Sequence, residues 1–390
     1  MNQMSNIGQS ERETQSRVIA LFTEQLGYDY RGNWHDQQRT LPVEVELLRD
    51  FLDKPARYSE GLINLAVQKF NALVNDSSKG LYETNKAVYE ALRYGVKELD
   101  KETQLIKTVE LINWAEPLNN HFAIAEEVTI KGENVKRPDI VLYVNGIALA
   151  VLELKKATVS VSEGNRQNLD NQESVFIQPF FATMQLVMAG NDSQGIRYGT
   201  TKTAEKYFLT WHEASTEENL LTRHILQLCD KRRLLELVHD FVVFDAGVKK
   251  LPRSHQYFGV KAAQDFIRRR EGGIIWHTQG SGKSLTMVWL TKWIRGFNPN
   301  GRVLIVTDRT ELDKQIESVF LGVNEEIYRT QNGLDLANQL NTMTPWLLCS
   351  LVNKFGSKST ADDEFIEQLK RSLASNGKVK GDLYVFVDEC

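Results

Sequence analysis

Two carboxylates and a lysine near the middle of the sequence have side chains suited to cutting phosphodiester bonds. Asp139 precedes one short apolar run, and Glu153 and Lys155 end the next. Phosphodiester hydrolysis needs oxygen ligands for Mg²⁺ and a nearby cation that stabilises the developing charge. We therefore take Asp139 and Glu153 as candidate Mg²⁺ ligands, and both of them with Lys155 as candidate catalytic residues.

Two predicted strands, residues 140–144 and 147–154, are expected to position these side chains. They flank Asn145-Gly146, a strong signal for a β-hairpin. Because side chains alternate along a strand, Glu153 and Lys155 should face the same way.

The turn must also bring Asp139 to the face of Glu153. A plain two-residue turn would place Asp139 opposite Leu152, which faces the other side of the sheet. We therefore predict a three-residue loop, residues 144–146, with Gly146 as a bulge residue. This register places Asp139 opposite Val151, on the face that Glu153 shares.

Helical periodicity follows at residues 162–176, then strand-like runs at 180–188 and 207–211 and a helical run at 217–238. Gln172 and Phe176 lie four residues apart on the predicted helix, where a glutamine amide could approach the hairpin. Gln172 is therefore a further catalytic candidate. Upstream, residues 41–111 show mostly helical periodicity, broken at Pro55 and Gly80.

A glycine-rich loop at residues 277–284 is the most specific local signal. It follows a predicted strand, residues 273–276, and opens a predicted helix, residues 284–295. Glycines allow the backbone N–H groups to surround phosphates, a lysine reaches the outer phosphates, and a following hydroxyl suits Mg²⁺. His277 replaces the usual leading glycine, and a glycine-rich turn without a ligand is the alternative. The candidate ATP-binding residues here are Thr278, Gly280, Ser281, Gly282, Lys283 and Ser284, with Ser284 also on the ATP-bound Mg²⁺.

An apolar run at residues 383–387 ends in Asp388 and Glu389, the pattern of a Walker B strand. After a phosphate-binding loop, the first acid can hold Mg²⁺ and the second can orient the attacking water. On its own, such a strand end is also a common surface turn. With predicted strands at 303–306 and 346–351 and a helix at 311–320, the order is that of a parallel sheet with crossover helices.

The composition is that of a soluble globular protein of two or three domains, with 42% hydrophobic and 25% charged residues in 390. We divide the chain into residues 1–240 and 241–390, with the boundary between Val238 and Leu251. No apolar run approaches the roughly 18 residues of a membrane span and the N-terminus lacks a signal peptide, so we expect a cytoplasmic protein without a membrane partner. The three cysteines, Cys229, Cys349 and Cys390, should be ordinary thiols.

The net charge of −4 argues against a free-standing basic DNA-binding domain. Any DNA contact must be local. The basic clusters are Lys249-Lys250 with Arg253, and residues 268–270, and the simpler interpretation of each is a solvated surface.

Residues 137–155 resemble the PD-(D/E)xK nuclease core of one family, the restriction (motor and endonuclease) subunit of type I restriction-modification enzymes. Gln172 matches that family's Q-x-x-x-Y glutamine, with Phe176 where the tyrosine stands. Residues 253–257 are similar to the segment before the first helicase motif, and Gln256 there is a candidate adenine reader. Residues 307–313 resemble motif Ia, which contacts DNA, and residues 388–390 the start of a D-E-C-H motif II.

The resemblance implies an α/β fold: a PD-(D/E)xK restriction-endonuclease-like domain followed by the first RecA-like domain of a superfamily 2 helicase. It implies ATP-driven translocation and Mg²⁺-dependent cleavage of double-stranded DNA, with methyltransferase (M) and specificity (S) subunits as partners. Family members continue past motif II with a second RecA-like domain. We therefore expect this chain to be an N-terminal fragment that cannot translocate alone.

Two other functions fit parts of the pattern. One is a superfamily 2 helicase or DNA remodeller whose N-terminal domain is a scaffold with structural carboxylates. The other is a signalling P-loop ATPase unrelated to nucleic acids, which leaves residues 137–155 unexplained. Mg²⁺-dependent nicking and DNA-stimulated ATP hydrolysis distinguish the three.

Overall fold

The computed structural model describes residues 11–54, 57–307, 310–323, 325–351 and 380–388. The chain divides into two compact units, Met1–Ser254 and His255–Cys390. Each unit has its own sheet, so each is described by itself.

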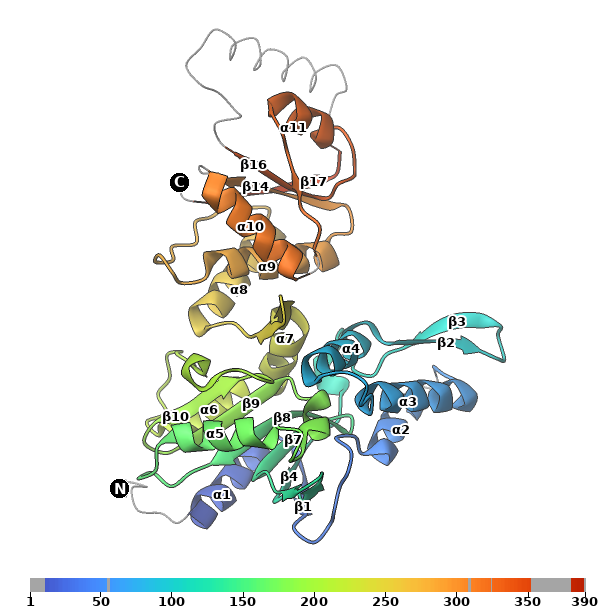
Figure 1. Ribbon diagram of the computed structural model, residues 1–390, viewed down its shortest axis with the longest axis vertical. Helices are drawn as coiled ribbons and strands as arrows, with labels where there is room; N and C mark the ends of the chain where they lie inside the picture. Colours follow the sequence, from blue (N-terminus) through green and yellow to red (C-terminus); the bar gives the residue numbers. More distant parts are fainter. Residues whose placement is uncertain (1–10, 55–56, 308–309, 324, 352–379, 389–390) are drawn as a thin grey trace. The chain divides into compact units, whose positions relative to one another are not determined.

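The first unit is built on a seven-stranded mixed sheet in the order β1-β4-β7-β8-β9-β10-β11 (Figure 1). β1 pairs with β4 and β8 with β9 in parallel, and the other neighbours are antiparallel. The two central strands, β7 and β8, are buried along their whole length. The strands are β1 (Asp29–Asn33), β4 (Phe122–Glu126), β7 (Ile140–Val144), β8 (Ile147–Leu154), β9 (Leu186–Asn191), β10 (Gly195–Gly199) and β11 (Leu209–Thr210).

Helices cover both faces of this sheet. A Cβ at Gly164 of α5 (Val161–Asn171) would meet the Ala189 side chain, whereas a Cβ at Gly190 would meet Leu221 of α6 (Leu220–Leu228). Because Ala189 and Gly190 are adjacent on β9, their side chains face opposite ways, so α5 and α6 lie on opposite faces. The core on the α5 face includes Val141, Val151, Val187, Phe180 and Phe181.

The remaining elements of this unit surround the sheet, and the β2–β3 hairpin extends away from it (Figure 1). The helical pattern of residues 41–111 is confirmed for three helices, but the sequence did not predict β2 and β3. The predicted helix 217–238 is two helices, because Asp230 caps a new one by accepting from the Arg233 amide. The elements are α1 (Glu11–Ala20), a π-helical turn (Leu21–Gln25), α2 (Val45–Asp53), α3 (Glu60–Val74), α4 (Leu81–Tyr94), β2 (Val96–Asp100), β3 (Leu105–Val109), β5 (Ile130–Lys131), β6 (Val135–Lys136), α7 (Lys231–Phe241), β12 (Val243–Asp245), β13 (Val248–Lys250) and 3-10 turns at Pro117–Asn119, Gln178–Ala182 and Glu205–Tyr207.

The second unit contains the predicted parallel sheet, in the order β15-β16-β14-β17. Leu304, Val306, Leu336, Leu340 and Leu348 form a core between this sheet and α11. The elements are α8 (Ser254–Arg268), which begins at the boundary between the units, α9 (Lys283–Phe297), β14 (Gly301–Thr307), α10 (Thr310–Gly322), β15 (Tyr328–Arg329), α11 (Gly333–Leu340), β16 (Leu347–Leu351) and β17 (Asp382–Val387).

The predicted strand 273–276 is wrong, because these residues form no strand and join no sheet. Ile274 and Trp276 are each 88% exposed. A strand is stable only beside another strand, and among the described residues β17 pairs with β14 alone. Val385 and Val387 on β17 are correspondingly half-exposed.

The β7–β8 hairpin has a different turn from the one we predicted. Val144 pairs with Ile147 across a two-residue turn, in which Asn145 (φ 51°) and Gly146 (φ 77°) are both left-handed. The register then shifts between Leu142 and Tyr143, where β8 carries one extra residue. The three-residue loop is therefore wrong, and the bulge lies inside the strand instead of at the turn.

We predict that Asn145→Gly destabilises the first unit although glycine fits the turn. The Asn145 side chain is fully buried, accepts from the His121 amide (2.8 Å) and donates to the Leu111 carbonyl (3.0 Å). Losing these bonds leaves buried groups without partners, which costs about 2–4 kcal/mol. Urea unfolding measures the loss in the free energy of unfolding. Asn134→Gly, on an exposed hairpin, is the control. Equal losses in both variants would contradict this account.

Candidate functional site

The bulge in β8 brings Asp139 and Glu153 face to face. Ile140 pairs with Leu152, so Asp139, one residue earlier, lies opposite Glu153, one residue later. The Asp139 Oδ2 atom accepts from the Leu154 amide at 2.6 Å. Glu153 is fully buried and accepts from Gln167 Nε2 (2.8 Å) and from Asn171 Nδ2 (3.4 Å), both on α5. The predicted convergence therefore holds, although the predicted register does not.

Burial makes both carboxyl groups hard to ionise. Burial raises the pKa of Asp139 to about 6, opposed by the Leu154 amide and the Lys155 charge. Burial and then the charge of Asp139 raise the pKa of Glu153 well above its usual value. When two carboxyl groups lie together in a buried site, a proton or a cation between them is favoured.

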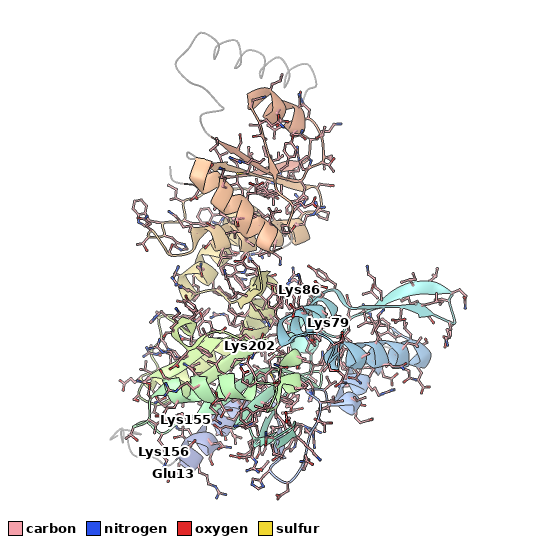
Figure 2. All side chains as sticks on the ribbon, viewed as in Figure 1. Glu13, Lys79, Lys86, Lys155, Lys156 and Lys202 are labelled. Atoms are coloured by element: carbon pink, nitrogen blue, oxygen red, sulfur yellow. The ribbon has the colours of Figure 1, made fainter. Side chains whose placement is uncertain are left out.

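Lys155 lies beside this pair at the end of β8. Its charge lowers the pKa of both acids. The Nζ atom donates to the Leu154 carbonyl (3.0 Å) and lies 3.9 Å from Glu11 Oε1 on α1. Figure 2 shows Lys155 close to the α1 end of the unit, with Lys156 beside it.

The carboxylate pair fits a Mg²⁺ ion. Within the described ranges, no three His, Cys, Asp or Glu side chains gather as a metal-binding group. Mg²⁺ is commonly held by one or two carboxylates, with water and substrate phosphate as its other ligands. Asp139 and Glu153 match that pattern.

Gln172 is not placed at the carboxylates. Its Oε1 atom accepts from the Lys202 amide (2.7 Å), and its Nε2 atom donates to the Asn168 carbonyl (2.9 Å). α5 ends at Asn171, so the continuous helix to residue 176 that we predicted does not form. Phe176 contacts Lys136, whose Nζ lies 3.9 Å from the ring centroid.

The glutamine that reaches Glu153 is Gln167, five residues earlier. Asn171 follows it at the same four-residue spacing that we assigned to Gln172 and Phe176. The signal that we missed was the face of α5 that packs against the sheet. A Cβ at Gly164 on this face would lie 3.6 Å from the Glu153 Cβ. Gln167 and Asn171, one and two turns after Gly164, therefore face the carboxylates.

In the second unit, the glycine-rich loop has the backbone that phosphate binding requires. Gly280 (φ 74°) and Gly282 (φ 86°) are left-handed, and Lys283 is the first residue of α9. Gln256 on α8 donates through Nε2 to the carbonyls of Ser281 (3.1 Å) and Gly282 (3.0 Å). Its amide therefore supports the loop itself.

The other candidates of this loop lie around the same turn. Thr278 is exposed and its carbonyl accepts from the Ser281 amide (3.2 Å), while Ser284 is partly buried in the first turn of α9. The His255 and His277 rings pack edge to face, 4.9 Å between centroids. His277 thus takes the leading glycine's place by packing on α8.

Asp388 directly follows β17 and is buried, with its amide donating to the Val306 carbonyl (2.9 Å). The predicted strand 383–387 is confirmed. Glu389 and Cys390 lie outside the described residues. Cys229 and Cys349 are buried free thiols.

The expected solvated surface is wrong for Lys249, whereas Arg268 and Arg269 are exposed but paired with acids. Lys249 is buried and donates to Asn85 Oδ1 (2.7 Å), the Met184 carbonyl (3.0 Å) and Gln185 Oε1 (2.7 Å). In the second cluster, Arg268 pairs with Asp265 (2.6 Å) and Arg269 with Glu271 (2.9 Å).

A mixed α/β protein that joins a buried carboxylate pair to a phosphate-loop unit is the class that these features define. Residues 8–206 match the family model described as type I restriction enzyme R protein N terminus. Residues 255–390 match the SWI2/SNF2 ATPase model. Because the first match covers more than half of the 390 residues, the chain belongs to the type I restriction enzyme R protein family.

Curated relatives have related names. The chain is 27% identical to a subunit described as the putative MjaIXP type I restriction enzyme endonuclease subunit of Methanocaldococcus jannaschii, over 86% of this chain and 36% of the relative. It is 26% identical to the type I restriction enzyme HindI endonuclease subunit of Haemophilus influenzae, over 82% and 33%. The chain thus spans about a third of the length of these relatives. No described helix is long and apolar enough to cross a bilayer.

We predict that the carboxylate pair makes the first unit less stable as pH rises. The folded-state pKa of Asp139, about 6, lies above its unfolded value, so the folded chain binds more protons. The stability that Asp139 contributes is therefore fully present below about pH 4 and is lost as pH rises through 6, at about 1.4 kcal/mol for each pH unit between the unfolded and folded pKa.

Glu153→Gln should remove part of this dependence and raise the melting temperature at pH 8 more than at pH 4. Mg²⁺ should stabilise wild type at pH 8, because it binds the ionised pair. Glu163→Gln, at an exposed position of α5, is the control. If the melting temperatures of wild type and Glu153→Gln changed equally with pH from 4 to 8, the carboxylate pair would not be the source of the pH dependence.

Proposed function

We propose that this chain is the nuclease and first motor portion of a type I restriction R subunit, which cleaves double-stranded DNA and couples cleavage to ATP-driven translocation. In this proposal residues 1–240 form a PD-(D/E)xK domain and residues 241–390 the first part of a RecA-like domain. The observation that carries it is the buried pair of Asp139 and Glu153 with Lys155 beside it, in a chain of this family.

Each residue of the first site has a distinct part in this chemistry. Mg²⁺, when bound, polarises the scissile phosphate and supplies an activated water. Asp139 and Glu153 would hold it, and the Lys155 ammonium would stabilise charge that develops on the phosphate. Gln167 and Asn171 hold the Glu153 carboxylate from α5, so they position a ligand and do not need to touch DNA.

The second site would bind ATP through the loop from Thr278 to Ser284, with Lys283 on the outer phosphates and Ser284 on the ATP-bound Mg²⁺. Asp388 would hold the same Mg²⁺ through water, and Glu389 would orient the attacking water. Gln256 would act mainly by supporting the loop. The carbonyl bonds of its amide favour this role over adenine reading.

The partners in this proposal are double-stranded DNA and the M and S subunits of a restriction-modification complex in the cytoplasm. A DNA remodeller with a structural N-terminal domain is the second candidate, favoured by the SWI2/SNF2 match. A scaffold, however, gains nothing from two buried acids that face one another, because such a pair lowers stability.

We predict that Lys155→Ala abolishes cleavage and leaves ATP hydrolysis intact. Losing one charge stabiliser should reduce the cleavage rate by about 10²–10³, whereas Lys155 lies in the other unit from the phosphate loop. Cleavage and DNA-stimulated ATP hydrolysis are measured on the R subunit assembled with M and S. Lys156→Ala, the neighbouring lysine, is the control. Normal cutting by a folded Lys155→Ala enzyme would refute the nuclease role.

We predict that Lys283→Ala weakens nucleotide binding without unfolding the chain. Its charge-assisted contact to phosphate is worth roughly 1.5–3 kcal/mol, about 10- to 100-fold in affinity. Titration of a fluorescent ATP analogue measures it, with Lys314→Ala, exposed on α10, as the control. In the assembled enzyme, Lys283→Ala should stop both translocation and the cutting that depends on it. If Lys283→Ala bound the nucleotide with unchanged affinity, the phosphate-loop interpretation would be wrong.

A further inference from the structure

The β5–β6 hairpin leads directly into the candidate nuclease site. Glu126 of β4 pairs with Ile140 of β7. Ile130 of β5 pairs with Lys136 of β6 in the same register. The hairpin therefore prolongs the two strands beyond Asp139, and Lys136, three residues earlier, lies about 10 Å from it along the ribbon.

Lys136 faces the side of the sheet on which the carboxylates lie. Ile130, its cross-strand partner, is buried in the same core cluster as Val141 and Phe180, on the α5 face. Directly paired residues of antiparallel strands project to the same side. Glu153 is also held from α5, by Gln167. The lysine and the carboxylates therefore share one face.

The Phe176 ring holds the ammonium group of Lys136, with Nζ 3.9 Å from the ring centroid. The ring is fixed because the turn of the hairpin packs on its backbone. A Cβ at Gly132 would lie 1.9 Å from the Phe176 carbonyl oxygen, and Asn134 Nδ2 donates to the Val175 carbonyl at 2.7 Å. A ring attracts an ammonium ion but carries no net charge, so the charge of Lys136 remains available to an anion.

The hairpin has an excess of positive charge. Residues 130–137 include three basic side chains, Lys131, Lys136 and Arg137, and one acid, Glu133. In the described ranges of the chain Lys136 forms no ion pair. The acid that follows α5, Glu173, pairs instead with Lys202 at 2.9 Å. A positively charged ribbon thus lies beside a site whose own side chains include two acids.

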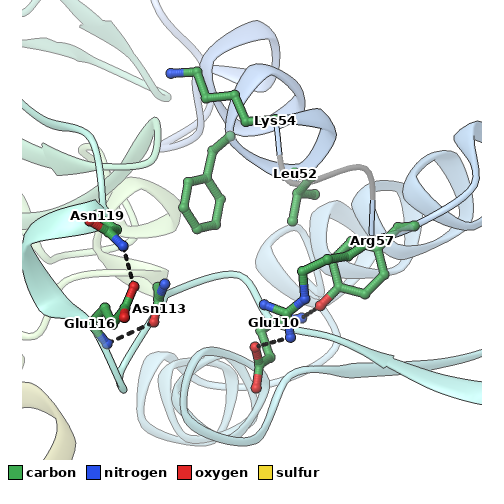
Figure 3. A pocket seen from close by; sticks show the side chains of 9 residues that line it. Leu52, Lys54, Arg57, Glu110, Asn113, Glu116 and Asn119 are labelled. Carbon is green, nitrogen blue, oxygen red and sulfur yellow. Dashed lines mark hydrogen bonds and ion pairs between the residues drawn. The ribbon is translucent and has the colours of Figure 1, made fainter.

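A cavity near α2 shows a different balance of charge. It measures about 380 Å³ and is lined by Lys54 and Arg57 but also by Glu110 and Glu116 (Figure 3). Arg57 pairs with Glu110 at 3.1 Å. The basic residues there are matched by acids, whereas those of the β5–β6 hairpin are in excess.

The position of Lys136 suits the spacing of charge on a DNA duplex. Two carboxylates repel phosphates, so a duplex that approaches Asp139 and Glu153 must be held by cations around them. A duplex carries one negative charge for every ~1.7 Å of its axis, both strands counted, so about 10 Å of axis carries about six. A duplex at the carboxylates therefore brings further phosphates within reach of Lys136.

We propose that Lys136, positioned by Phe176, binds a backbone phosphate of DNA close to the phosphate that is cut. This rests on the proposed function, because that function makes DNA the substrate. Lys136 contacts the duplex, whereas Phe176 is a positioning residue that acts through the lysine. The contact reads no base sequence, because contacts to phosphate position a duplex without distinguishing its bases.

The test is binding of a 20-base-pair duplex to the chain, measured by fluorescence anisotropy in EDTA at several salt concentrations. Lys136→Gln should bind roughly tenfold more weakly, and its slope of log K against log salt should be shallower by about 0.9, the value for one phosphate. Lys131→Gln is the matched control, because Lys131 is exposed and projects from the other face of the same hairpin. It should bind like wild type.

A double-mutant cycle tests the role of Phe176. Phe176→Leu removes the ring face and should weaken binding by about two- to fivefold, whereas Phe176→Tyr keeps the ring and should bind like wild type. Added to Lys136→Gln, Phe176→Leu should cause no further loss, because the ring then has no ammonium to hold. An equal loss in both backgrounds would show that Phe176 does not act through Lys136. Thermal melting without DNA checks that each variant is folded.

The outcomes separate this site from the nuclease proposal. If Lys136→Gln bound DNA with the wild-type affinity and salt slope, the phosphate site would be wrong even where the assembled enzyme cuts DNA. An equal loss in Lys131→Gln would show a diffuse charge effect and would also overturn the site, as would a wild-type chain that bound no duplex at the lowest salt concentration. If Lys136→Gln alone lost affinity and slope but the assembled wild-type enzyme did not cut, the site would stand and the nuclease assignment would fail.

Discussion

The first unit depends on holding two carboxylates together out of water. Like charges in one buried place repel, and each also loses hydration, so the fold must supply compensation. The bulge in β8 sets Asp139 opposite Glu153, the Leu154 amide binds the first acid, and Gln167 binds the second. Even the packing face of α5 is polar, with Asn165, Asn168 and Asn171 buried against the sheet. An apolar helix there would leave Glu153 without hydrogen-bond donors.

Other buried charges in this chain are held by neutral groups. The three acceptors of Lys249 match the three N–H bonds of an ammonium ion, although burial lowers its pKa well below the usual value. Arg302 is likewise fully buried and donates to the carbonyls of Gln339 (2.8 Å) and Pro345 (3.1 Å). These hydrogen bonds hold the β12–β13 hairpin and the end of α11 in place without an acidic partner. Asp139 and Glu153 differ from both in placing acids face to face.

The sequence predicted the elements better than their registers. Two short apolar runs and the Asn145-Gly146 turn located β7 and β8 to the residue, because both signals are local. The bulge is not local: nothing in the apolar run of β8 marks the extra residue, which is set by pairing. The assignment of Gln172 failed for a related reason, since Gln167 lies in the same polar segment and only packing against Glu153 distinguishes the two glutamines. Residues 273–276 were misassigned because an apolar run predicts a strand without saying which strand will pair with it.

The phosphate loop illustrates how one side chain can determine the direction of several backbone groups. In each peptide plane the carbonyl and the following N–H point in opposite directions. Gln256 binds the Ser281 and Gly282 carbonyls from one side, so the amides of Gly282 and Lys283 are directed to the other. Gly282 has a left-handed φ of 86°, and a Cβ there would lie 2.5 Å from Gln256 Nε2, so glycine allows this approach without strain. Gln256 and the glycines therefore act together to point N–H groups at the place where phosphate charge is expected.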